Sequence, residues 1–189
     1  MLYTERITAL ENEIESIIAD LNHTFYFVEP ENLHQKSSET WSAIEELEYA
    51  NLIGYHYMES LQKTVPTTSA PDVNDRHKIR LFARILIKRT AVRPTDTRKI
   101  SEAFTPVSQR NGNKQVRINE QKVFADLLAL LEMWKKMLHS GTGEDLKKTR
   151  LKTGFLSLFT LDALELAHIT LHIIRRQLEA AKKCVGIME

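Results

Sequence analysis

Four segments of this sequence place apolar residues at alternating intervals of three and four, which gathers their side chains on one face of an α-helix. The four apolar stripes are Ile7, Leu10, Ile14, Ile17 and Leu21; Ala43, Leu47, Ala50, Gly54, Met58 and Leu61; Phe124, Leu127, Leu131, Trp134 and Leu138; and Leu164, Ala167, Leu171, Ile174, Leu178 and Ala181. Each stripe must be buried against another element, so the pattern predicts an all-α protein built as a bundle of four long helices.

The ends of these helices are predicted from capping and loop residues. The first helix is expected to end near Asn22-His23, because residues 29–32 read as a connecting loop. The second is expected to begin at Thr40 and the fourth near Thr160, since a threonine hydroxyl can cap a helix. The third is predicted over about residues 119–138, and the fourth continues to about Lys183. Small residues in the second stripe should let a neighbouring helix approach closely.

The middle of the chain carries a weaker signal. Residues 72–89 have helical spacing and predict a short extra helix. Residues 90–117 have no sustained period and are interrupted by Pro94, Pro106 and Gly112. Because a connection of this length is uncommon, it is expected to be a long crossover loop that either lines a site or is a passive strap.

Length and charge limit the class of protein. The 189 residues are enough for one domain spanning 1–189. The 26 basic side chains are balanced by 25 acidic ones, so the chain has no large net positive charge with which to bind the phosphates of nucleic acid. No apolar run approaches the roughly 20 residues that span a bilayer, so no membrane partner is expected. The N-terminus lacks the order of a signal peptide, which favours a cytoplasmic protein. Cys184 is the single cysteine and cannot form an internal disulfide.

His168 and His172 are the residues that most suggest chemistry, because four residues apart on a helix they project side by side and can share one metal ion. At about 100° per residue they fall beside the apolar stripe rather than on it. The polar stripe that contains them also holds Glu165, Arg175, Arg176 and Glu179. This stripe therefore faces either solvent or a groove shared with another helix.

A catalytic metal site generally needs a third protein ligand and an open position for water. Three candidates lie on one side of the second predicted helix, away from its apolar stripe: Glu45, Tyr49 and His56. Tyr49 and His56 are about 10.5 Å apart along the helix axis, so both do not readily reach one ion. A tyrosine phenol has an ordinary pKa of about 10 and is a weak ligand, so Tyr49 is alternatively a packing aromatic.

Five short motifs occur in a set order along nearly the whole chain. They are Trp41-Ser42, Leu47-Glu48-Tyr49-Ala50, residues 99–106, residues 154–161, and the pair His168 and His172. In this order and spacing they resemble the DinB-like bundles, a family that includes YfiT-type metal-dependent hydrolases and thiol-dependent transferases.

The resemblance implies an antiparallel four-helix bundle with a divalent metal, such as nickel or zinc, in a groove. The family's ligands are one histidine from the second helix and two from the last. In this chain Tyr49 stands where the first histidine is expected. Arg175 stands where the family often carries glutamine, and Gln177 follows two positions later. Both differences lie at or beside the site that the resemblance implies.

Three hypotheses of function follow. In the first, the protein is an enzyme, either a metal-dependent hydrolase or a thiol S-transferase, in which His168 and His172 bind the divalent ion. Glu45 or a water molecule then completes the coordination, and the Tyr49 hydroxyl donates a proton. The ion would activate water or a thiol by lowering its pKa.

In the second hypothesis, which we favour, the metal site has degenerated and the groove binds a small molecule or nothing, with Tyr49, His168 and His172 linked by hydrogen bonds. In the third, the chain is a self-associating structural module that forms a homodimer. Its surface would be a second apolar strip on the last helix, formed by Leu166, Ile169 and Ile173, which must be covered by residues 90–117 or by a second subunit. The sequence does not identify a substrate or show whether a thiol cofactor is used.

Overall fold

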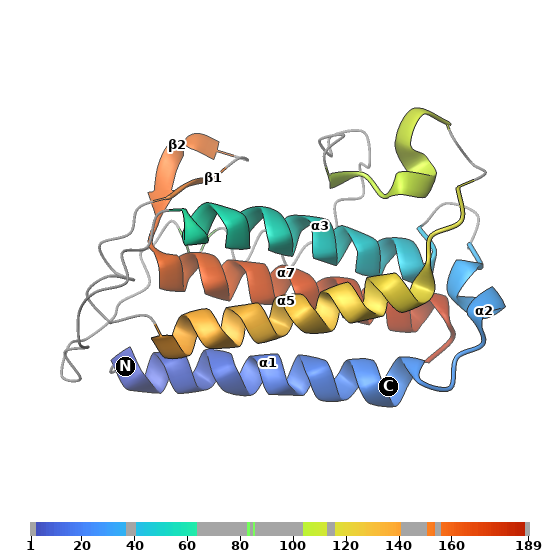
Figure 1. Ribbon diagram of the computed structural model, residues 1–189, viewed down its shortest axis with the longest axis horizontal. Coiled ribbons are helices and arrows are strands. Elements are labelled where there is room, and N and C mark those ends of the chain that lie inside the picture. The colour runs from blue at the N-terminus through green and yellow to red at the C-terminus, as the bar shows by residue number, and fades with distance from the viewer. Residues whose placement is uncertain are drawn as a thin grey trace.

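The computed structural model describes residues 3–36, 41–63, 83, 85, 104–112, 116–140, 151–153 and 156–187. These residues are mostly helical (Figure 1). The helices are α1 (Tyr3–Phe25), α2 (Pro30–His34), α3 (Ala43–Gln62), the 3-10 helix η3 (Val107–Gly112), α5 (Glu120–Ser140) and α7 (Ala163–Cys184). Two strands, β1 (Leu151–Thr153) and β2 (Leu156–Leu161), precede α7.

The four long helices lie side by side, and the order of their neighbours decides which side chains can meet (Figure 1). Helix α7 packs against both α3 and α1, and α5 also packs against both of them. The colours show that α1 and α7 run in one direction, whereas α3 and α5 run in the other (Figure 1). The prediction of a mostly helical protein with packed helices is confirmed. Its neighbouring helices are antiparallel in the pairs α3/α7 and α1/α5 and parallel in the pairs α1/α7 and α3/α5.

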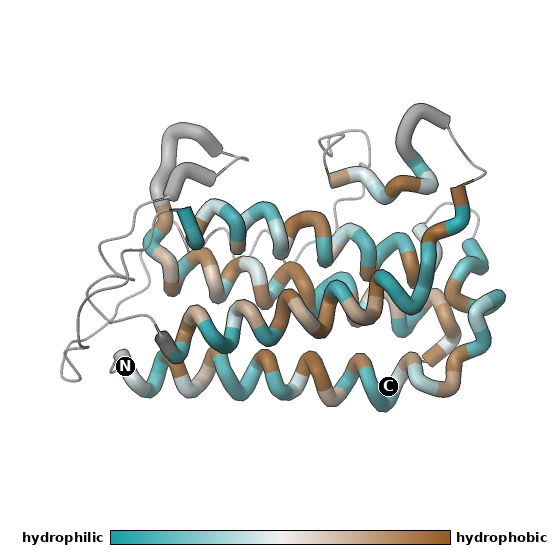
Figure 2. The backbone as a smooth tube through the Cα atoms, viewed as in Figure 1, coloured by the Kyte–Doolittle hydropathy of each residue, from teal (hydrophilic) through white to brown (hydrophobic). Residues whose placement is uncertain are grey.

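The apolar stripes form the core, as predicted. All positions of the second and fourth stripes are buried, and so are those of the first and third except Ile7 and Phe124, which are partly buried against the core. Apolar and polar stretches alternate along each long helix (Figure 2). The helices are therefore held together mainly by burial of one apolar face on each.

Gly54 shows why small residues are needed in the second stripe. A Cβ atom at this position would collide with Cδ2 of Leu130 on α5, and Leu130 is itself fully buried. The absence of a side chain lets the two helices approach closely. The predicted close approach is thus confirmed at Gly54, and the partner helix is α5.

Two predicted helix starts are wrong or untested. Helix α7 begins at Ala163, because Asp162 caps it: the Asp162 carboxylate accepts from Glu165 N at 2.9 Å, and Glu165 Oε2 accepts from Asp162 N at 3.2 Å. This reciprocal pair satisfies two backbone donors, which a cap at Thr160 would leave open. Helix α3 begins at Ala43 after the cap Ser42, and Thr40 lies outside the described residues.

Residues 156–161 form a strand instead of the start of the last helix. In this strand Leu161 pairs with Leu151 and Thr160 with Lys152 in an antiparallel hairpin. Leu156 and Leu158 flank the polar Ser157, but Phe159 interrupts this spacing of two, so the sequence carried no strand alternation. The hairpin is an addition to the predicted all-α fold.

Residues 29–32 are also not the predicted simple loop, since α2 begins at Pro30. Proline is tolerated in the first turn of a helix because its missing N–H has no partner there. Leu33 of α2 is buried, and His34 Nε2 lies 2.7 Å from Glu120 Oε1 at the start of α5. The first long helix ends at Phe25, slightly later than predicted.

Most of the predicted short helix and crossover, residues 72–89 and 90–117, lies outside the described residues. The described part of the crossover contains η3, which is attached to α3 by hydrogen bonds from Val107 N to Glu48 Oε2 at 3.0 Å and from Gln109 Nε2 to Glu45 Oε1 at 2.7 Å. Among the described residues no helix combines the length and apolar character required to cross a membrane.

Candidate functional site

His168 and His172 lie in the wall of a small cavity between α7 and α1. The cavity has a volume of about 190 Å³ and is lined from α1 by Arg6, Leu10 and Glu13, and from α7 by the two histidines and Leu171. Both histidines are partly buried. The sequence-based expectation of a groove shared with another helix is therefore met, and the second helix is α1.

The surroundings of the two imidazoles favour their neutral forms. Burial, the Arg6 charge and His172 together lower the pKa of His168 from 6.5 to about 4. Burial and the Arg176 charge lower the pKa of His172, against an opposing effect of Glu13. At neutral pH each ring therefore has one N–H donor and one acceptor nitrogen.

Arg6 and His172 have polar atoms that make no hydrogen bond within the described part of the chain. These atoms are Nε and Nη2 of the Arg6 guanidinium and Nε2 of His172, and all three are buried. Burial lowers the pKa of Arg6, although the nearby Asp162 charge acts in the opposite direction. Leaving buried donors unsatisfied costs free energy, so such atoms mark a place where a ligand or an ordered water would be stabilised.

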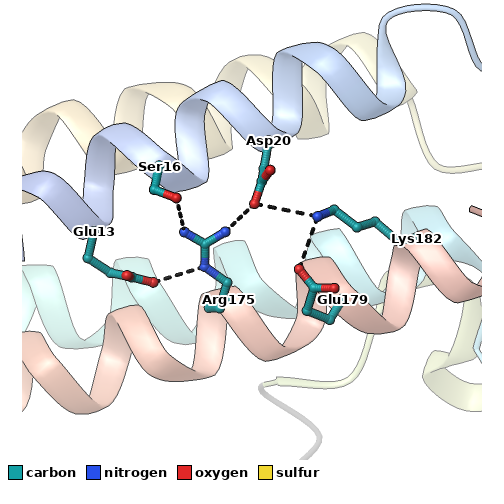
Figure 3. Close-up of polar contacts among 6 residues, drawn as sticks. All are labelled: Glu13, Ser16, Asp20, Arg175, Glu179 and Lys182. Carbon is teal, nitrogen blue, oxygen red and sulfur yellow. Dashed lines mark hydrogen bonds and ion pairs between the residues drawn. The ribbon is translucent and has the colours of Figure 1, made fainter. Parts of the chain in front are cut away.

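Glu13, on the same wall, is held by a cluster that joins α1 to α7 (Figure 3). Arg175 Nε donates to Glu13 Oε1 at 2.9 Å, its Nη2 donates to Ser16 Oγ at 2.7 Å, and its Nη1 pairs with Asp20. Lys182 extends the cluster toward Asp20 (Figure 3). Arg175, which stands where the resemblance would place glutamine, thus fixes the spacing of the two helices beside the cavity.

Tyr49 has the environment of a packing aromatic. It is 5% exposed, and its ring contacts Trp41 with the ring centroids 5.1 Å apart. Burial raises its pKa, while the Arg176 charge partly opposes this. Arg176 therefore acts electrostatically on both Tyr49 and His172.

Contacts between α3 and α7 show at which height along α7 the Tyr49 position lies, compared with the two histidines. Cys184 Sγ donates to Trp41 O at 3.3 Å, and the Gln177 amide lies against the Glu46 carboxylate, so the start of α3 is beside the end of α7. By this register Tyr49 lies near the level of Arg175 and Arg176, about one turn from His172 and about two turns from His168 along α7.

The described residues include no group of three His, Cys, Asp or Glu side chains arranged to hold a metal ion. The donors in the lining of the α1/α7 cavity are the two imidazoles and the Glu13 carboxylate, which Arg175 already engages, and the guanidinium groups of Arg6 and Arg176 act on the imidazoles. Two permanent positive charges oppose a divalent cation. The described residues therefore do not fit the metal that the resemblance implies.

Glu45 is a structural carboxylate rather than a free ligand or acid. It is 2% exposed and accepts hydrogen bonds from Ser42 N, Ser108 Oγ and Gln109 Nε2, and Lys36 Nζ lies 2.9 Å from its Oε1. Burial raises its pKa, but these hydrogen bonds outweigh burial and lower the pKa overall. Its oxygens are used to cap α3 and to hold η3.

His56 lies on another face of α3 from the one that meets α7. It is exposed and packs its ring against Phe104, with centroids 5.1 Å apart. With Phe104 it lines a larger groove of about 550 Å³ between α3 and α5. Sequence reasoning missed this groove, although Asn51, a polar residue one turn after Leu47 of the apolar stripe, was a visible signal of it.

The apolar strip that would mediate self-association is already covered. Leu166, Ile169 and Ile173 are 1%, 5% and 6% exposed within the single chain. The homodimer therefore stays a prediction, and the surface proposed for it is not available without rearrangement.

Comparison with known proteins adds no assignment. No known protein family, curated protein or solved structure matches this chain.

Proposed function

We propose that this protein is a DinB-like bundle whose α1/α7 cavity binds a small molecule through an oxyanion, with Arg6, His168 and His172 as hydrogen-bonding groups and without a metal. The observation that carries the proposal is the Arg6 guanidinium, whose Nε and Nη2 are buried and unpartnered among the described residues, beside the two histidines. This follows the second of the three hypotheses drawn from the sequence, with a chemical class of ligand added and without Tyr49, which does not line the cavity.

The guanidinium favours a carboxylate or a phosphate. Its N–H groups form a planar fork that matches two oxygens of such a group, and hydrogen bonds between charged partners are stronger than neutral ones. The neutral histidines add donors without adding charge, and His172 Nε2 has no partner among the described residues. An oxyanion would thus satisfy buried atoms of both helices.

The size of the cavity and the Glu13 carboxylate, two turns after Arg6 on α1, narrow the ligand further. A volume of about 190 Å³ corresponds to roughly six water molecules, which admits ligands of only a few heavy atoms. Glu13 is anionic and already accepts a hydrogen bond from Arg175. It favours a ligand that presents a hydroxyl or amino donor at the end remote from the oxyanion.

The proposal is tested by isothermal titration calorimetry with phosphate, glycolate and methylammonium as probes. We expect phosphate or glycolate to bind and methylammonium not to bind. Arg6→Gln should weaken the oxyanion at least about tenfold, since it removes a charged hydrogen-bond donor. Lys183→Gln is the matched control, because it removes one exposed positive charge from the end of α7. Equal loss in both variants, or preference for methylammonium, would overturn the proposal.

A further inference from the structure

We propose that the groove between α3 and α5 is a second ligand site, which takes a small flat organic cation whose N–H group donates to Asn51 Oδ1. Asn51 lines this groove and is 6% exposed, and its Oδ1 has no hydrogen-bond partner among the described residues. A buried acceptor of this kind is costly unless a donor reaches it. No donor among the described residues therefore reaches Asn51 Oδ1.

The orientation of the Asn51 amide is determined by its other end. Asn51 Nδ2 donates to the backbone carbonyl of Val123 on α5 at 2.9 Å. A rotated amide would bring Oδ1 against that carbonyl oxygen, where two acceptors would repel each other. Oδ1 therefore remains the unpartnered acceptor of this lining residue.

The charges around the groove favour a cation. Glu48, Glu59 and Asp126 contribute carboxylates to its lining. The two cations of the lining are each engaged with a carboxylate, Lys122 with Asp126 of the same lining at 2.5 Å and Arg117 with Glu120 outside it at 2.9 Å, so carboxylates outnumber cations in the lining. An oxyanion would be repelled by these carboxylates and would offer no donor to Asn51 Oδ1.

Aromatic side chains favour a flat ligand. Tyr55, His56 and Phe104 line the groove, and the Tyr55 hydroxyl is fixed by donating to Asp126 O at 3.0 Å. Aromatic faces attract cations and stack on flat rings. The volume of about 550 Å³ accommodates a molecule of the size of a substituted benzene ring.

This site is independent of the α1/α7 cavity, because no residue lines both and the two favour ligands of opposite charge. Failure of one site leaves the other proposal standing. The experiment for the groove therefore uses probes that the α1/α7 cavity should not prefer.

The test is an NMR titration of the ¹⁵N-labelled protein with benzamidine, a flat cation with N–H donors, and with benzoate, a flat anion of similar size. Benzamidine should shift the Asn51 side-chain amide saturably, and benzoate should not. Asn51→Leu should weaken benzamidine at least about tenfold, since it removes the acceptor.

Because Asn51→Leu also removes the bond to Val123, a second variant preserves the fold. Glu59→Gln changes an exposed side chain of the groove and should weaken benzamidine about two- to fivefold. Glu132→Gln, an exposed carboxylate of α5 that is absent from the groove lining, is the matched control and should have no effect. Equal binding of benzamidine and benzoate, no shift at Asn51, or equal effects of Glu59→Gln and Glu132→Gln would overturn the proposal.

Discussion

Arg6 of α1 and His168 of α7 line the same cavity although 162 positions separate them in the sequence, and the Arg6 charge contributes to lowering the pKa of His168 to about 4. Burial, together with the Arg6 charge, keeps the His168 ring uncharged, and Arg6 is the one permanent cation among the described residues that line the cavity. In the proposed function, this relationship favours an anion over a metal ion as the ligand of the cavity. Predictions about protonation, metal binding and packing follow from it and from the contacts around it.

The first prediction concerns acid stability. The His168 pKa is lower in the folded protein than its ordinary 6.5, so the unfolded chain binds more protons between those values. The stability that neutral His168 contributes should be complete above pH 6.5 and should be lost as the pH falls toward about 4. Urea denaturation of the wild type and of His168→Gln at several pH values measures this. The variant should lose less stability over that range; parallel curves for the two proteins would contradict the prediction.

The second prediction concerns the pKa of His168 itself. Arg6→Gln removes a charge that lowers it, so the pKa of His168 should rise from about 4 toward 6.5. An NMR titration of the imidazole carbon-bound protons follows this change. Lys183→Gln should leave the His168 titration where it is, and a similar rise in that control would show that global charge, rather than Arg6, is responsible.

The third prediction concerns Tyr49 and metal binding. If Tyr49 merely replaces a lost third ligand, Tyr49→His should create a tight nickel or zinc site. The Arg176 charge and the position of Tyr49, about two turns beyond His168 along α7, lead us to expect that it does not. Elemental analysis after exposure to either metal should find less than about a tenth of an equivalent in the wild type and the variant. Stoichiometric metal in Tyr49→His would show that the three side chains do converge.

The fourth prediction concerns Gly54. Alanine is the better helix former by about 1 kcal/mol, but its Cβ would collide with buried Leu130. Gly54→Ala should therefore lower the free energy of unfolding, by about 1–3 kcal/mol. In a double-mutant cycle with Leu130→Ala the two losses should be less than additive, because the second change removes the colliding atoms. Stabilisation by Gly54→Ala alone would contradict the packing described.

Much of the fold could be predicted because an apolar stripe indicates which face of a helix is buried. The stripe from Ala43 to Leu61 is buried at each position. It could be predicted because the helical period of 3.6 residues, which gathers these residues on one face, is a property of this segment alone. Helix ends were harder to predict, because several caps compete locally: Asp162, with Glu165 three residues later, caps α7 better than Thr160 does.

The candidate site could be predicted only in part. His168 and His172 were identified from their spacing, which is local. Arg6 was not, because its place opposite them depends on α1 being the neighbour of α7. Asn51 was not either, because a missing hydrogen bond at Oδ1 becomes visible only when α5 and its Val123 carbonyl are in place.

The most direct test of the oxyanion site is the imidazole nitrogen spectrum of His172 during addition of phosphate or glycolate. Its Nε2 is buried in the wall of the cavity without a partner among the described residues, so a ligand held by Arg6 should change its chemical shift saturably. The account predicts this change in the wild type and in Lys183→Gln, and its loss in Arg6→Gln. A His172 signal that neither anion changes in the wild type, or that responds equally in Arg6→Gln, would contradict it.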